Sequence, residues 1–236
     1  MLSRFMLQGY SDRQLRDQVI NFVLAGRDTT AILLTWTLFE LAQRPAVVES
    51  LRTEADACGK RSTNAEDAYP VSETPSSGPL GFEDLARMPY LKATLTEVMR
   101  LHPSVPLDFK MATRADTLPD GTAIRRGERV MFVAYAMGRL PALWPEPERF
   151  DPSRHLDPAT GAFKFPSPHT FPVFLAGPRT CLGKDMAYLG AGLILTALLS
   201  RFDISLADPP ERVQYDLGLT LWTTNGVSIR FKERSF

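Results

Sequence analysis

The fold of this chain is decided by one stretch, Phe174-Leu175-Ala176-Gly177-Pro178-Arg179-Thr180-Cys181-Leu182-Gly183. Gly177-Pro178 is a turn signal, and Gly183 allows close approach of the backbone. Apolar residues then recur at helical spacing, which predicts a helix directly after the cysteine: Leu182, Met186, Leu189, Leu193 and Ala197. Cys181 is therefore expected at a helix N-terminus, where unpaired N–H groups and the helix dipole favour a thiolate.

Two interpretations of Cys181 are open. A cysteine that stands alone before a helix is usually a small buried hydrophobic residue. Here it belongs to an ordered pattern of five positions: Phe174, Gly177, Arg179, Cys181 and Gly183. This pattern resembles the haem-binding loop of the cytochrome P450 superfamily.

The resemblance implies that Cys181 is the thiolate ligand of the iron in haem b (iron protoporphyrin IX). It also implies that Phe174 shields the thiolate and that Arg179 meets a haem propionate. Gly177 and Gly183 belong to the same haem-binding pattern. Thiolate ligation pushes electron density toward the iron and favours O–O cleavage. These five residues and Lys110 are the cofactor-binding candidates, and Cys181 is the candidate metal ligand.

Composition sets broad limits. The chain has 236 residues, 44% hydrophobic and 23% charged, which is typical of a soluble globular protein. Its net charge is zero, so no nucleic-acid partner is indicated. Two cysteines make no disulfide framework and favour a reducing compartment. The most apolar run, Met186 to Leu199, is too short for a bilayer and predicts a core helix.

A long helix is predicted from the Ser11-Asp12 cap to about Gln43, with Gln14 completing a capping box. Inside it lies Ala25-Gly26-Arg27-Asp28-Thr29-Thr30, whose glycine and polar residues weaken a helix. One interpretation is a kinked amphipathic helix with solvated polar residues.

The other interpretation is functional: Gly26 opens a groove over a cofactor, and Asp28 and Thr29 form an acid–alcohol pair. The six residues resemble the oxygen-activating helix motif of the same superfamily. There the pair is implied to relay protons during dioxygen activation, as a hydroxyl and a carboxylate can do through ordered water. Asp28 and Thr29 are thus the catalytic candidates.

A further helix is predicted over Phe82–Leu101, ending before Pro103. Glu97 and Arg100 share one of its faces, and most such pairs are weak surface salt bridges. The run Glu97 to Pro103 resembles the ExxR helix of the family. The resemblance assigns Arg149 as the third charge of a structural lock behind the haem loop.

The resemblance places a substrate-pocket wall at Val105, Pro106, Leu107 and Phe109, and a further substrate contact near Leu219 to Trp222. Lys110, or alternatively Arg114, is expected to pair with the second propionate.

The remaining chain predicts short elements. Pro45 to Ala57 is expected to be helical, and residues 58–80 an exposed loop with the composition of disordered segments. Asp120-Gly121 predicts a hairpin between 112–118 and 122–134. Strands are expected at 202–206, 215–223 and 227–231, with Asn225-Gly226 as the turn joining the last two. The fold class is mainly α with small antiparallel β-sheets: a cytochrome P450 fold, C-terminal portion only.

The resemblance covers nearly all of residues 1–236 but only the C-terminal half of the family's proteins. We therefore expect a fragment or a truncated gene model that forms the C-terminal haem-binding part of one domain. By itself this chain is expected to bind haem poorly or not at all. The full-length parent is expected on the cytosolic face of the endoplasmic reticulum membrane, attached only through an N-terminal region.

The implied reaction inserts one atom of dioxygen into a C–H bond of a lipophilic substrate. The stretches Ala25–Thr30 and Ala176–Asp185 resemble the branch that hydroxylates fatty acids and alkanes near their terminal carbon. Electrons would come from an NADPH-dependent reductase docking near the cysteine side, where Lys184 is either a docking contact or a solvated charge. Two alternatives remain: a haem-thiolate isomerase or dehydratase that does not use dioxygen, and a non-catalytic remnant.

Overall fold

The computed structural model describes residues 6–59, 80 and 82–235. Its helices are α2 (Asp12–Leu41), α3 (Pro45–Gly59), α4 (Phe82–Ala86), α5 (Pro89–Leu101), α6 (Ala134–Met137) and α7 (Lys184–Arg201). Short 3-10 turns are η2 (Pro152–His155), η3 (Pro172–Phe174), η4 (Gly177–Arg179) and η5 (Pro210–Arg212). The mainly α class is confirmed.

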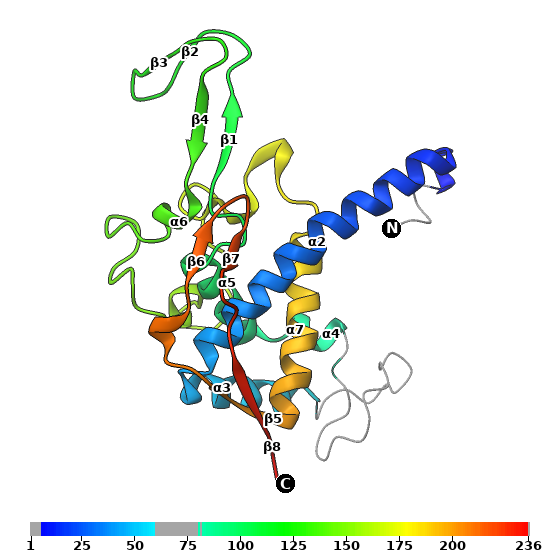
Figure 1. Cartoon of the computed structure of the whole chain (residues 1–236), viewed down its shortest axis with the longest axis vertical. Helices are drawn as coiled ribbons and strands as arrows, with labels where there is room; N and C mark the ends of the chain where they lie inside the picture. Colours follow the sequence, from blue (N-terminus) through cyan, green and yellow to red (C-terminus); the bar gives the residue numbers. More distant parts are fainter. Residues whose placement is uncertain (1–5, 60–79, 81, 236) are drawn as a thin grey trace.

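The strands pair into small antiparallel sheets, each two-stranded within the described part of the chain. They are β1 (Asp108–Met111) with β4 (Arg129–Phe132), β2 (Asp116–Thr117) with β3 (Ala123–Ile124), β5 (Phe202–Leu206) with β8 (Ile229–Glu233), and β6 (Tyr215–Leu217) with β7 (Leu221–Thr223). The first two sheets form one long arm that projects from the helical body (Figure 1).

The core lies where α2, α3, α5 and α7 pack together (Figure 1). Leucines from all four helices are buried there, including Leu33, Leu51, Leu95 and Leu195. Trp36 of α2 is also buried, and its indole N–H donates to the carbonyl of Leu221 at 3.0 Å. This bond fastens the C-terminal strands to the helical core.

Helix α2 begins as predicted. The Ser11 hydroxyl accepts from the Gln14 backbone N–H, and the Gln14 side chain accepts from the Ser11 N–H, so the capping box is present. The helix ends at Leu41, ahead of Pro45. Its C-terminal half is buried, whereas the N-terminal half extends away from the body as an arm (Figure 1).

The single helix predicted over residues 82–101 is instead two, α4 and α5, with a break at Arg87 and Met88. Pro89 lacks an N–H and starts a new helix. Glu54 of α3 accepts the N–H groups of Tyr90 and Leu91 at 2.7 and 2.8 Å, so a neighbouring helix caps this start.

The predicted loop over residues 58–80 begins later than expected. Cys58 and Gly59 belong to the end of α3. Residues 60–79, which carry most of this prediction, lie outside the described residues.

The predicted pairing of the last two strands is wrong. Residues 215–223 fold back on themselves as the hairpin β6–β7, and β8 pairs with β5 instead. Asn225 stabilises the hairpin rather than a β7–β8 turn: its side chain accepts from the Gln214 N–H and donates to the Arg212 carbonyl.

Helix α7 also differs from the expected pattern. It starts at Lys184, after the N-cap Gly183, so Leu182 is outside the helix and 75% exposed. The buried face is Ala191, Leu195 and Leu199, not the stripe that begins at Leu182. The mid-helix of α7 is apolar on most sides, so periodicity alone could not choose the face.

Candidate functional site

The cysteine loop is held by its own backbone. The Cys181 N–H donates to the carbonyl of Phe174 at 2.9 Å, which closes the loop across seven residues. Thr180 donates both its N–H and its hydroxyl to the carbonyl of Gly177, at 3.0 and 2.8 Å. These bonds fix the thiol relative to the aromatic ring.

Two residues in this loop have left-handed backbones. Gly177 has φ +66°, which glycine adopts without steric cost. Leu175 has φ 58° and ψ −170°, a conformation found almost only at glycine, so the loop carries local strain. Gly183 has an ordinary φ of −88°, and an added Cβ would lie 3.9 Å from the Cys181 sulfur. The backbone at this position would therefore accept a residue with a side chain, so neither its conformation nor the space around it requires glycine.

The Cys181 thiol is free and exposed, three residues before α7 begins. The alternative of a buried hydrophobic cysteine is therefore wrong for this structure. The Arg179 guanidinium is exposed, and within the described part of the chain no carboxylate pairs with it. A thiol and a cation are thus presented together on one loop.

Phe174 packs against two other aromatic rings. Its ring lies 5.9 Å from the ring of Tyr188 and 6.4 Å from that of Phe165. The Lys184 ammonium sits 3.3 Å from the Phe165 ring centre, so this lysine is not merely a solvated charge. This aromatic group positions the loop against the first turn of α7.

The polar segment of α2 approaches the same helix. A Cβ on Gly26 would lie 3.7 Å from the terminal methyl carbon of Met186 in α7. Gly26 is thus where the oxygen-motif segment meets the helix that follows the cysteine. Gly26 and Cys181 are 155 positions apart in the sequence. The structure therefore places the oxygen-motif segment on a helix that adjoins the one following the cysteine loop.

Asp28 and Thr29 are partly exposed on α2. The Thr29 hydroxyl donates to the Ala25 carbonyl at 2.7 Å, and the Asp28 carboxylate lies 3.7 Å from the Arg27 guanidinium. Ser104, just after α5, donates its hydroxyl to the Thr29 carbonyl at 2.8 Å. This bond ties the motif to the segment that was predicted to line a pocket.

A buried ionic lock joins helix α5 to the segment around η2. Glu97 and Arg100 are fully buried and form two parallel hydrogen bonds of 2.8 Å. His155 contacts Glu97 at 2.9 Å, and the Asp151 N–H donates to it at 2.9 Å. Burial opposes the Glu97 charge, but the hydrogen bonds from Arg100 and His155 outweigh it and lower its pKa to about 2.

The prediction that Arg149 is the third charge of this lock is wrong. Its side chain is exposed and pairs with Glu146 at 2.8 Å, and only its backbone carbonyl reaches Arg100. Arg154 takes the inner position instead, with Nε 3.3 Å from the Glu97 carboxylate. This contact lacks hydrogen-bond geometry and is therefore electrostatic.

The sequence contained a signal for this arrangement that was missed. Pro152-Ser153-Arg154 repeats the proline-to-arginine spacing of Pro147-Glu148-Arg149. The Arg154-His155 pair supplies both inward side chains.

Other predicted residues lie on other elements of the fold. Lys110 is on β1 in the projecting arm, where its ammonium pairs with Asp108 at 3.1 Å. Leu219 and Trp222 are exposed at the β6–β7 hairpin.

The residues present fit a haem. Within the described residues no cluster of three metal-ligating side chains occurs, so the donor set here is a single thiol. One axial thiolate suits a metal whose equatorial ligands come from a prosthetic group. The nearby exposed apolar side chains, Leu182 and Met186, suit its apolar face.

A single thiol shares one loop with a cation, and the helix after it meets the segment that carries an acid–alcohol pair. This is the kind of site that haem-thiolate proteins require. A model of the cytochrome P450 family matches residues 3–229. The chain therefore belongs to the cytochrome P450 family.

Curated relatives agree. The chain is 38% identical to cytochrome P450 CYP94D108 of Paris polyphylla, over 100% of this chain and 46% of the relative. It is 35% identical to cytochrome P450 86B1 of Arabidopsis thaliana, over 97% of this chain and 40% of the relative. It is 38% identical to cytochrome P450 94B1 of the same plant, over 99% of this chain and 44% of the relative. The chain thus spans a little under half the length of these relatives.

Members of this family use haem b as their cofactor. The relatives' CYP94 and 86 groups fit the resemblance to the fatty-acid hydroxylase branch. Within the described residues, no helix is both long enough and apolar enough to cross a membrane.

Proposed function

We propose that this chain supplies the thiolate-bearing part of a haem monooxygenase. The reaction would insert one oxygen atom from dioxygen into a C–H bond of a lipophilic substrate. The observation that carries the proposal is the exposed Cys181 thiol, tethered to Phe174 and presented beside Arg179. Family membership supports it independently.

The chain's own residues would divide the work as follows. Cys181 would bind the iron, Arg179 would pair with a propionate, and Phe174 would shield the sulfur. When bound, the haem would supply the activation of dioxygen. Lys110 is a weaker candidate for the second propionate, because Asp108 already occupies its ammonium group.

Asp28 and Thr29 would form a proton relay. The Thr29 hydroxyl now donates its proton to the Ala25 carbonyl, so a rotation about its side chain would free that proton for transfer. The Asp28 carboxylate, partly open to solvent, would resupply it through water. This pair favours the monooxygenase over a haem-thiolate isomerase or dehydratase, which has no need of such a relay.

Fatty-acid hydroxylation is the finer proposal. It is supported by the motif resemblance and by relatives named in the CYP94 and 86 groups. An NADPH-dependent reductase would supply electrons, and the cytosolic face of the endoplasmic reticulum membrane is the proposed location.

The test compares the chain alone with a fusion behind the N-terminal region of a CYP94 relative. Each protein is reduced, exposed to carbon monoxide and examined by absorption spectroscopy. We expect little or no haem on the chain alone and a strongly red-shifted Soret band in the fusion, lost in Cys181→Ala. A folded fusion without that band, or a band that survives Cys181→Ala, would contradict the proposal. Fatty acids with a reductase would then test the substrate class.

A further inference from the structure

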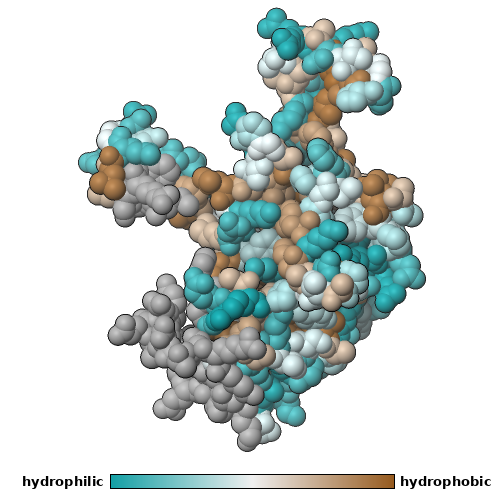
Figure 2. Space-filling model, turned by 180° about the vertical axis from the view of Figure 1, so that it is seen from behind, coloured by the Kyte–Doolittle hydropathy of each residue, from teal (hydrophilic) through white to brown (hydrophobic). Residues whose placement is uncertain are grey.

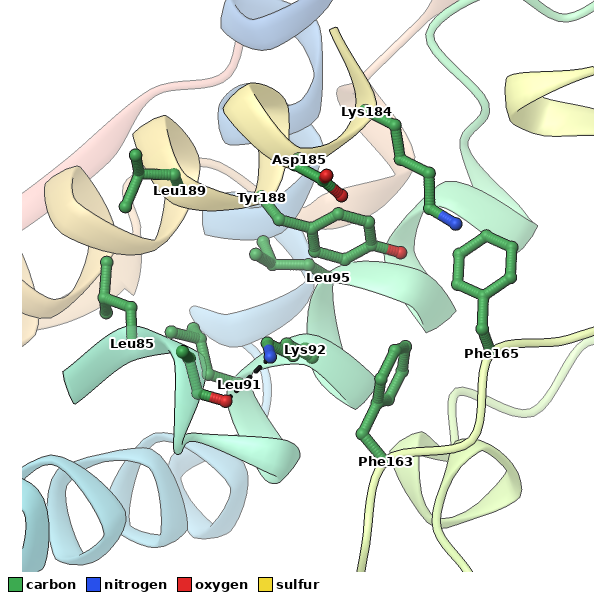
Figure 3. A pocket seen from close by; sticks show the side chains of 11 residues that line it. Leu85, Leu91, Lys92, Leu95, Phe163, Phe165, Lys184, Asp185, Tyr188 and Leu189 are labelled. Carbon is green, nitrogen blue, oxygen red and sulfur yellow. Dashed lines mark hydrogen bonds between the residues drawn. The ribbon is translucent and has the colours of Figure 1, made fainter. Parts of the chain in front are cut away.

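A pocket of about 320 Å³ lies on the far side of α7 from the oxygen-motif helix. It is a half-open pocket lined by α4, α5, α7 and the segment around Phe163 and Phe165 (Figure 3). Leucines from three helices form its apolar part, namely Leu85, Leu91, Leu95 and Leu189. Its volume is at the lower end of the range for small-molecule sites.

The pocket adjoins the aromatic group that packs against Phe174, but it does not include the Cys181 thiol. Helix α7 contributes Lys184, Asp185, Tyr188 and Leu189 to its wall, while Cys181 is not among the lining residues. Met186, which meets α2 at Gly26, is two residues from Tyr188 and so points to the opposite side of the helix. No step of the proposed monooxygenase reaction uses this pocket.

The pocket has one lysine near Phe165 and another on its leucine-lined side (Figure 3). Lys184 reaches from α7 across the ring of Phe165, and Lys92 donates to the Ala86 carbonyl at 2.8 Å (Figure 3). Within residues 6–59, 80 and 82–235, neither ammonium group forms an ion pair. Among the described lining residues Asp185 is the one acidic side chain, and it is exposed, so the described lining carries a net positive charge.

Tyr188 offers no hydrogen-bond donor to a ligand in this pocket. The Thr96 hydroxyl donates to the Lys92 carbonyl at 2.7 Å, so the Tyr188 hydroxyl, 2.7 Å from Thr96, must be the donor between them. Burial raises the pKa of Tyr188, so this hydroxyl stays neutral. Its ring separates the leucine-lined part from Lys184 and Phe165 (Figure 3).

We propose that this pocket binds a lipophilic monocarboxylate of medium chain length. The carboxylate pairs with Lys184 beside Phe165, Lys92 adds positive potential, and the apolar chain lies among the leucines. A neutral lipid of the same length lacks the ion pair, and a small anion lacks the apolar contact. The inference does not rest on haem chemistry.

The test uses the 236-residue chain with leucine methyl groups labelled for NMR. Sodium decanoate is titrated below its micelle-forming concentration, with decanol as the uncharged comparison. We expect saturable shifts of the methyl groups of Leu85, Leu91, Leu95 and Leu189, and decanol to bind about tenfold more weakly.

Variants of two lysines test whether decanoate binding needs an ion pair with Lys184 or only positive charge nearby. Lys184→Gln should weaken decanoate binding about tenfold, and Lys184→Arg should restore it. Lys164→Gln, an exposed basic neighbour outside the pocket, should leave binding unchanged. Cys181→Ala should also bind normally, so loss of the haem site and loss of this site are distinguishable.

Several outcomes would overturn the proposal: no saturable methyl shifts, equal binding of decanol, or equal losses in Lys184→Gln and Lys164→Gln. If Lys184→Gln does not fold, Ala86→Trp tests the pocket by filling it from its exposed edge. Circular dichroism confirms folding, and a folded Ala86→Trp that still binds decanoate would also reject the site.

Discussion

Arg154 lies 3.3 Å from the Glu97 carboxylate, whereas Arg149, five residues earlier, faces solvent. Arg154 also donates to the carbonyls of Pro145 and Glu146, so it joins the irregular segment after α6 to helix α5. The ionic lock therefore has Arg100, Arg154 and His155 around one buried carboxylate.

Arg154→Ala is expected to destabilise the chain by about 2 kcal/mol or more, because it strips a charged partner and two carbonyl hydrogen bonds from a buried network. Arg149→Ala is the matched control. Its exposed ion pair should contribute about 0–1 kcal/mol. Urea unfolding of both variants measures the difference in the free energy of unfolding. Equal losses in the two variants would show that Arg154 contributes no more to the lock than Arg149 does.

Stability should fall in acid because of Glu97. Its pKa is about 2 in the folded chain and 4.5 in an unfolded reference. A carboxyl with a lowered folded-state pKa stabilises the fold above the unfolded value, so its contribution is full above pH 4.5 and is lost as pH falls toward 2.

Denaturant unfolding between pH 7 and pH 3 checks this. We expect the Glu97→Gln variant, if it folds, to start less stable and to lose less stability over that interval than the parent chain. Parallel pH curves for the two proteins would contradict the role of Glu97.

Features formed by residues close together in the sequence could be predicted from the sequence. The capping box of α2 and the Glu97–Arg100 pair were predictable, because their residues are three apart and meet within one helical turn. The cysteine loop was recognisable from five positions within ten residues.

Features that depend on distant partners were not predictable in this way. Arg149 and Arg154 each follow a proline by two positions, and tertiary packing decides which one turns inward. The pairing of β5 with β8 joins segments more than 20 residues apart, so the nearer turn at Asn225-Gly226 was misleading.

Exposed apolar surface also came only from the structure. Val19, Ile20, Val23 and Leu24 occupy the projecting part of α2, where Figure 2 shows hydrophobic surface along the arm. The same residues fit the helical periodicity of a buried face, and a sequence pattern does not state which element covers them.

Gly138→Ala should be severe. A Cβ at Gly138 would overlap the carbonyl oxygen of Arg100, and the Gly138 carbonyl also accepts from the Arg100 guanidinium. Because the clash is with backbone, relief would require α5 and α6 to separate. We expect a loss of at least about 2 kcal/mol.

Gly190→Ala is the control for that substitution. A Cβ there has nothing within 4 Å, and alanine favours the helix by about 0.5–1 kcal/mol, so α7 should become more stable. Thermal unfolding of the two variants should therefore shift in opposite directions. Unfolding temperatures that shift in the same direction and by the same amount would show that the close contact at Gly138 does not affect stability.

The two cysteines should differ in reactivity toward an aromatic disulfide reagent. Cys181 is exposed on its loop, whereas Cys58 is half-buried at the end of α3, with its sulfur 3.9 Å from the Arg87 carbonyl. Thiol exchange requires access to the sulfur, so Cys181 should react roughly tenfold faster in the folded chain. Cys181→Ser should remove the fast phase and Cys58→Ser the slow one. In the fusion described above, added haem should protect the fast thiol alone, and a fast phase that haem leaves unchanged would argue against Cys181 as the ligand.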